Sequence, residues 1–371
     1  METLYIASCV LSLFFIAILA GKKNKGLADQ ILLAWFIVLF SSVLFLYLIV
    51  IETATPWMIE LLDYSVFLQG PLLFFYTLAL CGKIKGISAS QLIHLFPFVF
   101  LVALALWMDY TSRAFLGPFS NWIIPVKFLS PLVYILVSMR LISQHRMHIK
   151  NLYSTTNHLE LKWLSSILWG GIVLMFIGSS SLLLHHLTPL EIPQYGGQYL
   201  NIAYSLSIII LGYNGFRQTA VFIQPPLDLG LEKPKQRKEA NAAVKYQNSR
   251  MDERLAQSVY QKLLNHMDSA KPYLDPDLTL YKLAEQLETT GNKLSHVINS
   301  LSGYNFFEFV NKYRIDLVIE KMEITDMRQI TLLGLALDCG FNSKASFNRA
   351  FKKFSGQTPS EYMKRMDVPN G

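Results

Sequence analysis

Residues 335–354 read LALDCGFNSKASFNRAFKKF, and their pattern is the strongest indication of how the C-terminal part of the chain folds. Its apolar spacing predicts two helices separated by a sharp turn at Gly340, where the missing Cβ permits a positive φ. Ser343 follows the turn and is suited to cap the second helix, because its hydroxyl can accept a bond from an exposed backbone N–H. Two short helices joined in this way form a helix-turn-helix, a shape that fits the major groove of duplex DNA.

A second pair of helices of the same kind is predicted upstream, over about residues 278–301. It is separated from the pair over residues 331–354 by a longer helix. The apolar residues expected to form the buried face of that helix recur at helical spacing: Phe306, Phe309, Val310, Tyr313 and Leu317. Four residues are the expected N-caps of the short helices: Thr279, Thr290, Thr331 and Ser343. The long helix would hold the two units at a fixed separation.

The polar faces of the second helix in each unit are the candidate DNA-reading surface. In the upstream unit this face holds Asn292, Ser295 and His296. In the downstream unit the aromatic residues face the core, which leaves Lys344, Ala345, Ser346, Asn348 and Arg349 toward solvent or DNA. Arg349 suits a guanine edge and Asn348 an adenine edge. Lys352 and Lys353 suit phosphate contacts, which supply affinity without reading sequence.

The composition divides the chain into two parts. Charged residues make up only 16% of the whole, against about 25% in soluble proteins. Residues 1–216 hold 11 of the 33 Lys and Arg and 8 of the 26 Asp and Glu, although they form the longer part. The first part is therefore expected to lie in a membrane, and the second to be soluble and mildly basic.

Seven apolar runs in the first part approach the roughly 20 residues that cross a bilayer as a helix. They are Leu4–Ala20, Ile31–Ile51, Leu61–Cys81, Leu92–Trp107, Trp122–Ile142, Trp163–Leu187 and Tyr199–Phe216. The predicted fold is thus all-α: a seven-helix transmembrane bundle over residues 1–216, a polar linker over 217–250, and a soluble two-unit helix-turn-helix domain over 251–371.

Loop charge predicts the orientation of this bundle, because Lys and Arg are retained on the cytoplasmic side. The first, third and fifth loops carry the basic residues Lys22, Lys23, Lys25, Lys83, Lys85, Arg146, Lys150 and Lys162. The other loops contain a single basic residue, Arg113. The N-terminus is therefore expected outside and the C-terminal domain in the cytoplasm.

Ionisable residues near the outer ends of the spans are candidates for sensing a signal, since such groups are costly in a bilayer. They are Glu60, Asp63, Asp109, Lys127, His185 and His186. The alternative is that they are interfacial groups whose polar ends reach the headgroups. No metal site is expected, because adjacent residues such as His185 and His186 diverge by about 100° on a helix. Cys9, Cys81 and Cys339 lack metal-ligand spacing and are expected to be reduced.

Residues from about 270 to 366 resemble the DNA-binding domain of the AraC/XylS family of bacterial transcription regulators. The matching positions are Leu335-Ala336, Gly340-Phe341, Phe347, Arg349, Phe351-Lys352-Lys353, Gly356 and Thr358-Pro359-Ser360-Glu361-Tyr362. The resemblance implies two recognition helices that enter successive major-groove segments on one face of DNA. It assigns base contacts to Asn292, Ser295, His296, Lys344, Ala345, Ser346, Asn348 and Arg349.

Two residues depart from the pattern of this family in ways that would weaken the reading of DNA. Ala345 can offer only an apolar contact, for example to a thymine methyl group. Gly291, near the start of the upstream recognition helix, weakens that helix by up to about 1 kcal/mol relative to alanine.

The sequence thus favours a transcription regulator in the bacterial inner membrane, multi-pass, with its DNA-binding domain cytoplasmic. Its expected partners are double-stranded promoter DNA and the bilayer, with RNA polymerase, an unknown small-molecule or membrane signal and a second copy of the chain also compatible. No catalytic residues, metal or cofactors are expected. The alternative is a membrane transporter or enzyme with a regulatory helical domain, for which a catalytic or ion-relay constellation is missing from the sequence.

Overall fold

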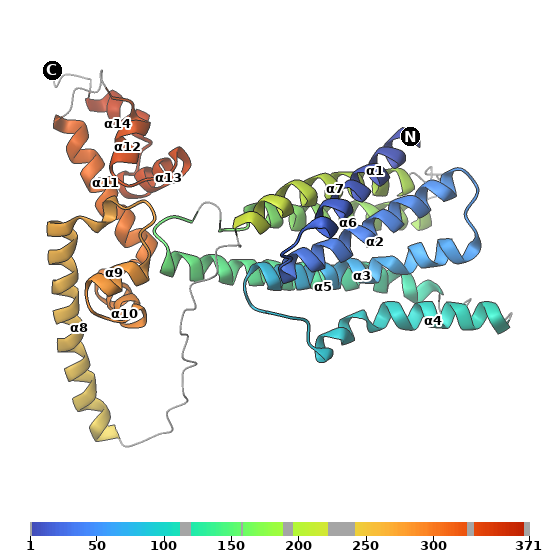
Figure 1. Ribbon diagram of the computed structural model, residues 1–371, viewed down its shortest axis with the longest axis horizontal. Helices are drawn as coiled ribbons and strands as arrows, with labels where there is room; N and C mark the ends of the chain where they lie inside the picture. Colours follow the sequence, from blue (N-terminus) through green and yellow to red (C-terminus); the bar gives the residue numbers. More distant parts are fainter. Residues whose placement is uncertain are drawn as a thin grey trace. The chain divides into compact units, whose positions relative to one another are not determined.

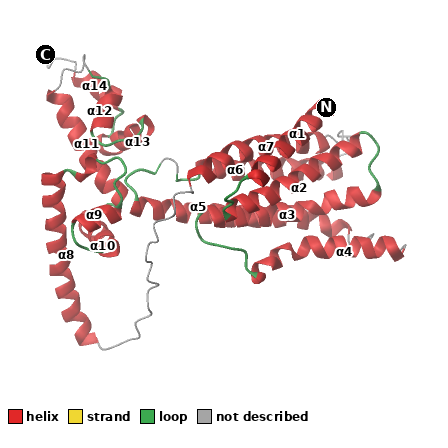
Figure 2. Ribbon diagram, viewed as in Figure 1, coloured by secondary structure: helices red, strands yellow, loops and turns green. Residues whose placement is uncertain are grey.

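The computed structural model describes residues 2–111, 120–156, 159–187, 196–221, 242–324 and 330–366. Every named element in these ranges is helical (Figure 2). The described backbone holds one isolated antiparallel bridge, between Tyr153 and Thr279. The chain forms two compact units. The N-terminal unit comprises Met1–Ser143 and Leu161–Leu231, and the C-terminal unit comprises Gln144–Glu160 and Glu232–Gly371.

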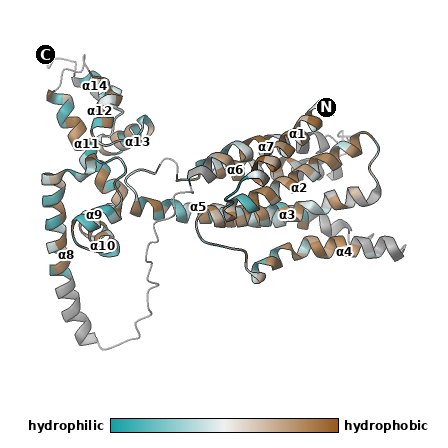
Figure 3. Cartoon of the chain, in the orientation of Figure 1, coloured by the Kyte–Doolittle hydropathy of each residue, from teal (hydrophilic) through white to brown (hydrophobic). Residues whose placement is uncertain are grey.

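The described residues of the N-terminal unit form seven α-helices, which are labelled in Figure 1, and one 3-10 helix. They are α1 (Glu2–Gly21), α2 (Leu27–Val50), α3 (Pro56–Leu80), η1 (Ala89–Leu95), α4 (Phe96–Thr111), α5 (Ser120–Leu152), α6 (Lys162–Leu187) and α7 (Gly196–Val221). The last nine residues of α5 belong to the C-terminal unit, because the boundary falls between residues 143 and 144. Figure 3 shows mainly hydrophobic residues along α1 and α2.

Polar side chains pair between the helices of the N-terminal unit. The hydroxyl oxygens of Ser8 on α1 and Ser205 on α7 lie 2.6 Å apart. The Trp35 indole N–H on α2 donates to the Gln69 side-chain oxygen on α3 at 2.7 Å. Hydrogen bonds of this kind hold apolar helices together where burial alone does not favour one partner over another.

Two of the described helices, α1 and α2, are long and apolar enough to cross a bilayer. Shorter apolar stretches occur at Tyr64–Leu80, Ala89–Leu104 and Lys162–Ile177. The prediction of seven spans was therefore wrong for the described residues, although helices lie at all seven predicted places. Helix formation does not ensure a spanning length of apolar residues. In α5, for example, Lys127 and Arg140 interrupt the apolar run.

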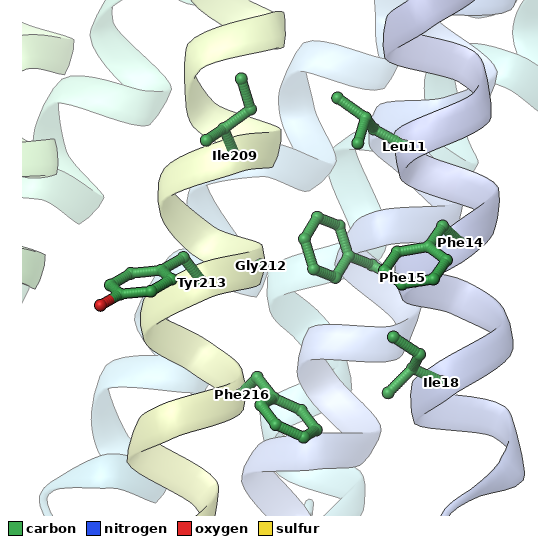
Figure 4. A pocket seen from close by; sticks show the side chains of 8 residues that line it. All are labelled: Leu11, Phe14, Phe15, Ile18, Ile209, Gly212, Tyr213 and Phe216. Atoms are coloured by element: carbon green, nitrogen blue, oxygen red, sulfur yellow. The ribbon is translucent and has the colours of Figure 1, made fainter.

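A shallow apolar groove of about 380 Å³ lies between α1 and α7 (Figure 4). Phe15 of α1 approaches Gly212 of α7 so closely that a Cβ on Gly212 would lie 2.2 Å from the ring. Glycine at this position therefore permits the close packing of the two helices.

The residues proposed from the sequence to sense a signal are described only in part. Lys127 on α5 is half-buried. The side chains of Glu60, Asp63, Asp109, His185 and His186 lie outside the described residues, as does the central part of the predicted linker, residues 222–241.

The C-terminal unit contains seven α-helices and one 3-10 helix in its described residues. After the end of α5 come α8 (Ala242–Ala270), η2 (Pro272–Leu274), α9 (Leu280–Gln286), α10 (Gly291–Ser302), α11 (Phe306–Ile324), α12 (Leu332–Asp338), α13 (Lys344–Ser355) and α14 (Pro359–Met366). Helices α9 and α10 form the upstream unit, and α12 and α13 form the downstream unit. The long helix α11 connects them.

Candidate nucleic-acid interface

Each of the four short helices begins at the N-cap that the sequence predicts. Thr279 and Thr290 accept hydrogen bonds from the backbone N–H groups of Lys282 and Lys293, at 3.2 and 3.3 Å. In the downstream unit, Thr331 accepts from Gly334 at 3.0 Å and Ser343 from Ser346 at 3.3 Å. These bonds satisfy backbone donors that the helix itself leaves unpaired, so they fix where each helix starts.

The core of the downstream unit fixes the orientation of α13. Ala336, Phe341, Phe347 and Phe351 are each at most 2% exposed. The Phe347 ring makes edge contacts with the rings of both Phe341 and Phe351, with centroids 5.5 Å apart in each pair. Because α13 is seated by these rings, its opposite face points away from the core.

Gly340 makes the turn between α12 and α13 with φ +90°. A Cβ at this position would lie 2.3 Å from the backbone oxygen of Tyr273, which a side-chain movement cannot relieve. Glycine is therefore required here by both conformation and space, in agreement with the sequence prediction.

We expect Gly340→Ala to destabilise the C-terminal unit by about 2 kcal/mol or more, because strain at positive φ adds to the backbone clash. Gly356 is the matched control, since its φ is +77° but a Cβ added there would meet nothing within 4 Å. Gly356→Ala should cost only the conformational part, about 1 kcal/mol. Hydrogen exchange of α11 and α13 amides in the full chain measures the loss of stability in each variant. Equal losses in Gly340→Ala and Gly356→Ala would contradict a role for the backbone clash.

Gly291 at the start of α10 has a packing role that the sequence did not reveal. It is buried, and a Cβ would lie 2.7 Å from the ring of Tyr281 on α9. The two helices of the upstream unit therefore approach closely at this point. The glycine that weakens α10 as an isolated helix also allows α9 to pack against it.

Most residues proposed to face DNA are on the outer faces of α10 and α13. Those exposed in the structure are Asn292, His296, Lys344, Ala345, Asn348, Arg349, Lys352 and Lys353. Ser295 is half-buried, and its hydroxyl accepts from the Asn299 amide at 3.4 Å. This surface is thus polar and basic, which suits phosphate and base contacts.

Ser346 does not lie on this face, so its prediction as a DNA-facing residue was wrong. It is only 4% exposed, and its backbone N–H bonds the Ser343 cap. The reason is helical spacing: Ser346 precedes the buried Ala350 by four residues and Phe347 by one, and it falls on their side of α13.

Lys353 is engaged within the unit. Its ammonium forms an ion pair with Glu308 in the first turn of α11 and lies 5.7 Å from the centre of the Phe354 ring. Partial burial raises the pKa of Glu308, but the Lys353 ammonium and the backbone N–H of Asn305 outweigh this and lower it below its usual range. The pair joins the end of α13 to the start of α11.

Arg314 on α11 is a buried charge that was not predicted from the sequence. It is 0% exposed, and its Nε donates to the Tyr273 carbonyl at 2.7 Å. Its guanidinium also lies 5.8 Å from the centre of the Phe341 ring in the downstream unit. Burial lowers the pKa of Arg314 to about 10, although Asp275 and Asp277 raise it, so the group is charged at neutral pH.

Part of the buried stripe of α11 also differs from the prediction. Phe306, Phe309 and Val310 are buried as expected, whereas Tyr313 and Leu317 are only half-buried. Further along, the buried residues are Arg314, Ile315, Val318 and Met322. The face turns because the second half of α11 packs in the core of the downstream unit, with Leu335 and Phe341. Arg314 follows the buried Val310 by four residues and therefore lies on the same face of α11. This spacing is the signal in the sequence that could have identified Arg314 as buried.

Neither a metal centre nor a reactive thiol is indicated by the described residues. No group of three His, Cys, Asp or Glu among them is placed to hold a metal ion. Cys339 is buried, and burial raises the pKa of its thiol to about 11, even though Lys321 lowers it. A thiol of this kind is inert at neutral pH.

Comparisons with known proteins match this same region. A family model described as a helix-turn-helix domain matches residues 283–365. An uncharacterized HTH-type transcriptional regulator of Staphylococcus aureus (strain COL) is 35% identical over 95 residues, which are 26% of this chain and 12% of that protein. The ornithine utilization regulator of Pseudomonas aeruginosa is 34% identical over 93 residues, 25% of this chain and 26% of that protein.

A solved structure of a Listeria innocua protein of unknown function aligns with 29% of this chain and 95% of its own length, at 24% identity and a TM-score of 0.26. The chain spans only 12% and 26% of the length of the two regulators, so the similarity concerns one domain. Residues 283–365 thus carry a helix-turn-helix domain of the AraC type, and such a domain implies DNA as its partner.

Proposed function

We propose that this chain is a membrane-anchored transcription regulator that reads duplex DNA with α10 and α13. One observation carries the proposal: both helices are capped and seated on apolar cores, and both present polar faces within the region that matches a helix-turn-helix domain. Two recognition helices in tandem would read two major-groove segments about one helical turn apart.

The exposed side chains divide into two roles. Arg349 and Asn348 on α13 have the donor patterns that read guanine and adenine edges. Asn292 and His296 present the corresponding polar face of α10, and Ala345 offers a methyl group to thymine. The exposed lysines, Lys344 and Lys352, are suited to phosphates, which position the helix on DNA without reading sequence.

The surface of the N-terminal unit supports membrane anchoring. Phe176, Phe14 and Phe100 are 73%, 56% and 51% exposed, on three different helices. Exposed apolar side chains on many helices are unfavourable in water and favourable in hydrocarbon. With α1 and α2 as candidate spans, we propose that this unit holds the chain at the bilayer.

We expect Lys352→Gln to weaken binding to any duplex and to reduce the slope of log K against log salt by about 1. The full chain in detergent with a duplex of arbitrary sequence suffices, because phosphate contacts do not depend on sequence. Lys353→Gln is the matched control at the next residue: its ammonium is paired with Glu308, so its effect should be smaller. A salt slope that is the same in wild type and Lys352→Gln would contradict the phosphate contact.

We expect the loop after α1, with Lys22, Lys23 and Lys25, and the C-terminus to lie on the same, cytoplasmic side. This requires that an odd number of the helices α3–α7 cross the bilayer in addition to the candidate spans α1 and α2. Reporter fusions after residue 25 and at the C-terminus measure this. A reporter that fluoresces only in the cytoplasm should fluoresce at both fusion sites. A phosphatase reporter that is active only in the periplasm should be inactive at both. Phosphatase activity at the C-terminus would contradict the proposal, because DNA would then be out of reach.

A further inference from the structure

The segment between α5 and α6 packs inside the C-terminal unit. Residues 144–160 belong to that unit, although they end 123 residues before residue 283, where the match to a helix-turn-helix domain begins. We call residues 153–156 the strap. Tyr153 forms an antiparallel bridge with Thr279, the N-cap of α9. The N-terminal unit is therefore connected to the DNA-reading helices in two ways: covalently through residues 222–241, and through the non-covalent contacts of the segment that follows α5.

The strap is bonded to the segment that leads into α9. The Ser154 backbone N–H and hydroxyl both donate to the Leu278 carbonyl, at 3.2 and 2.7 Å. The Thr155 hydroxyl donates to the Pro276 carbonyl at 3.0 Å. Backbone and side-chain bonds together fix the register of the strap on this segment.

The strap is also bonded to α11, which connects the two helix-turn-helix units. The Asn311 amide donates to the Ser154 carbonyl at 3.1 Å. Arg314 donates to the same carbonyl from Nη1 at 3.4 Å and to the Ser154 hydroxyl from Nη2 at 3.1 Å. Ser154 and Asn311 are 1% exposed and Arg314 is fully buried, so these bonds are shielded from water.

Arg314 has five N–H groups, and five acceptors surround them. Ser154 provides two of these bonds. The Tyr273 and Asp275 carbonyls and the Asn311 side-chain oxygen accept the other three, at 2.7, 2.8 and 3.4 Å. If the strap withdrew, a buried cation would lose two of five partners, which is unfavourable unless water enters or Arg314 moves.

The strap is held in shape by its own neighbours. The Thr156 hydroxyl donates to the Glu160 carboxylate, and both residues are buried. The Arg146 Nε donates to the Glu160 carbonyl at 2.7 Å. Because these bonds join the end of α5 to the segment after the strap, Ser154 is presented by a folded loop rather than by a loose one.

We propose that the strap is a docking element through which the N-terminal unit sets the arrangement of the two DNA-reading units, an inference that rests on the proposed function. The contacts lie at the joint of these units: Thr279 begins the upstream unit, and Arg314 on α11 touches Phe341 of the downstream unit. A displacement of α5 would therefore act on both. The strap would then have two states, docked on the C-terminal unit and released from it. A signal would shift the balance between them only if it bound the two states with different affinity.

The first test is a photo-crosslink in the full chain in its native membrane. A photoreactive phenylalanine replaces Tyr153, and a protease site is inserted between residues 225 and 240. After illumination and cleavage, the N- and C-terminal fragments should remain joined. The same replacement at Phe100, exposed on α4, is the control and should leave the fragments separate. Equal joining at the two positions, or none at Tyr153, would overturn the docking.

The second test compares Ser154→Trp with Ser269→Trp, an exposed serine near the end of α8, by hydrogen exchange in the full chain. Amides in residues 273–280 and 306–318 should exchange at least about tenfold faster in Ser154→Trp and unchanged in Ser269→Trp. Exchange rates in Ser154→Trp equal to those of wild type would overturn the docking of the strap.

The two tests also separate the docking from the proposed function. If the crosslinked fragments stay joined but the chain binds no DNA, the proposed function is wrong and the docking stands. If the chain binds DNA but the fragments do not stay joined, only the docking is wrong.

Discussion

Arg314→Ala is expected to destabilise the C-terminal unit by about 3–5 kcal/mol. The variant removes five hydrogen-bond donors from acceptors that are mostly buried, and it leaves a cavity beside Phe341. The contacts of Arg314 reach the lead-in to α9, the strap and the downstream core, so their loss should loosen all three together. An exposed arginine elsewhere in the unit should behave differently, because its donors are solvated in both the folded and the unfolded chain.

Hydrogen exchange in the full chain is the appropriate measurement, because all six tryptophans precede residue 170 and their fluorescence does not report on this unit. Arg365→Ala is the matched control: Arg365 is exposed on α14 and lies over the Tyr362 ring, 5.7 Å from its centre. Its loss should cost at most about 1 kcal/mol. Protection of α11 that is equally reduced in the two variants would show that Arg314 does not hold the joint.

The parts of the site that the sequence predicts well are those set by neighbours in the chain. An N-cap is recognised by its own residue type and by the helix that follows, so Thr279, Thr290, Thr331 and Ser343 were all assigned correctly. Gly340 was equally recognisable, since a turn between two helices requires a conformation that glycine adopts most easily.

The parts that the sequence did not predict depend on contacts between distant residues. Ser154 bonds Arg314 across 160 positions, and a serine in a polar loop gives no local sign of this. Ser346 was misplaced because a small polar residue at the edge of an apolar stripe fits either face. The face of α11 turned because two cores, rather than one, pack against it.

In the N-terminal unit, the sequence predicted the helices correctly but not the number of membrane spans. Apolar runs located the helices correctly, from α1 to α7. The number of spans did not follow, because a run of apolar residues predicts a helix more safely than it predicts a crossing. Among the described residues only α1 and α2 meet the length and composition of a span.

Arg349→Ala is expected to weaken binding to the chain's own target sites by about 1–3 kcal/mol while leaving binding to arbitrary duplexes nearly unchanged. The side chain is exposed on α13, opposite the ring cluster that seats this helix. Loss of a base-reading group removes discrimination, whereas the phosphate contacts of Lys352 remain. The fold should be intact, because Arg349 is not part of the core.

The assignment of α10 and α13 is tested most directly by a genome-wide map of DNA bound by the full chain, compared between wild type and Arg349→Ala at equal protein level. We expect a limited set of wild-type sites that share two sequence elements about one helical turn apart. In Arg349→Ala the preference in one element should disappear while the other remains. Bound sites with unchanged sequence preference, or no specific sites in wild type, would contradict the assignment of α10 and α13 as DNA-reading helices.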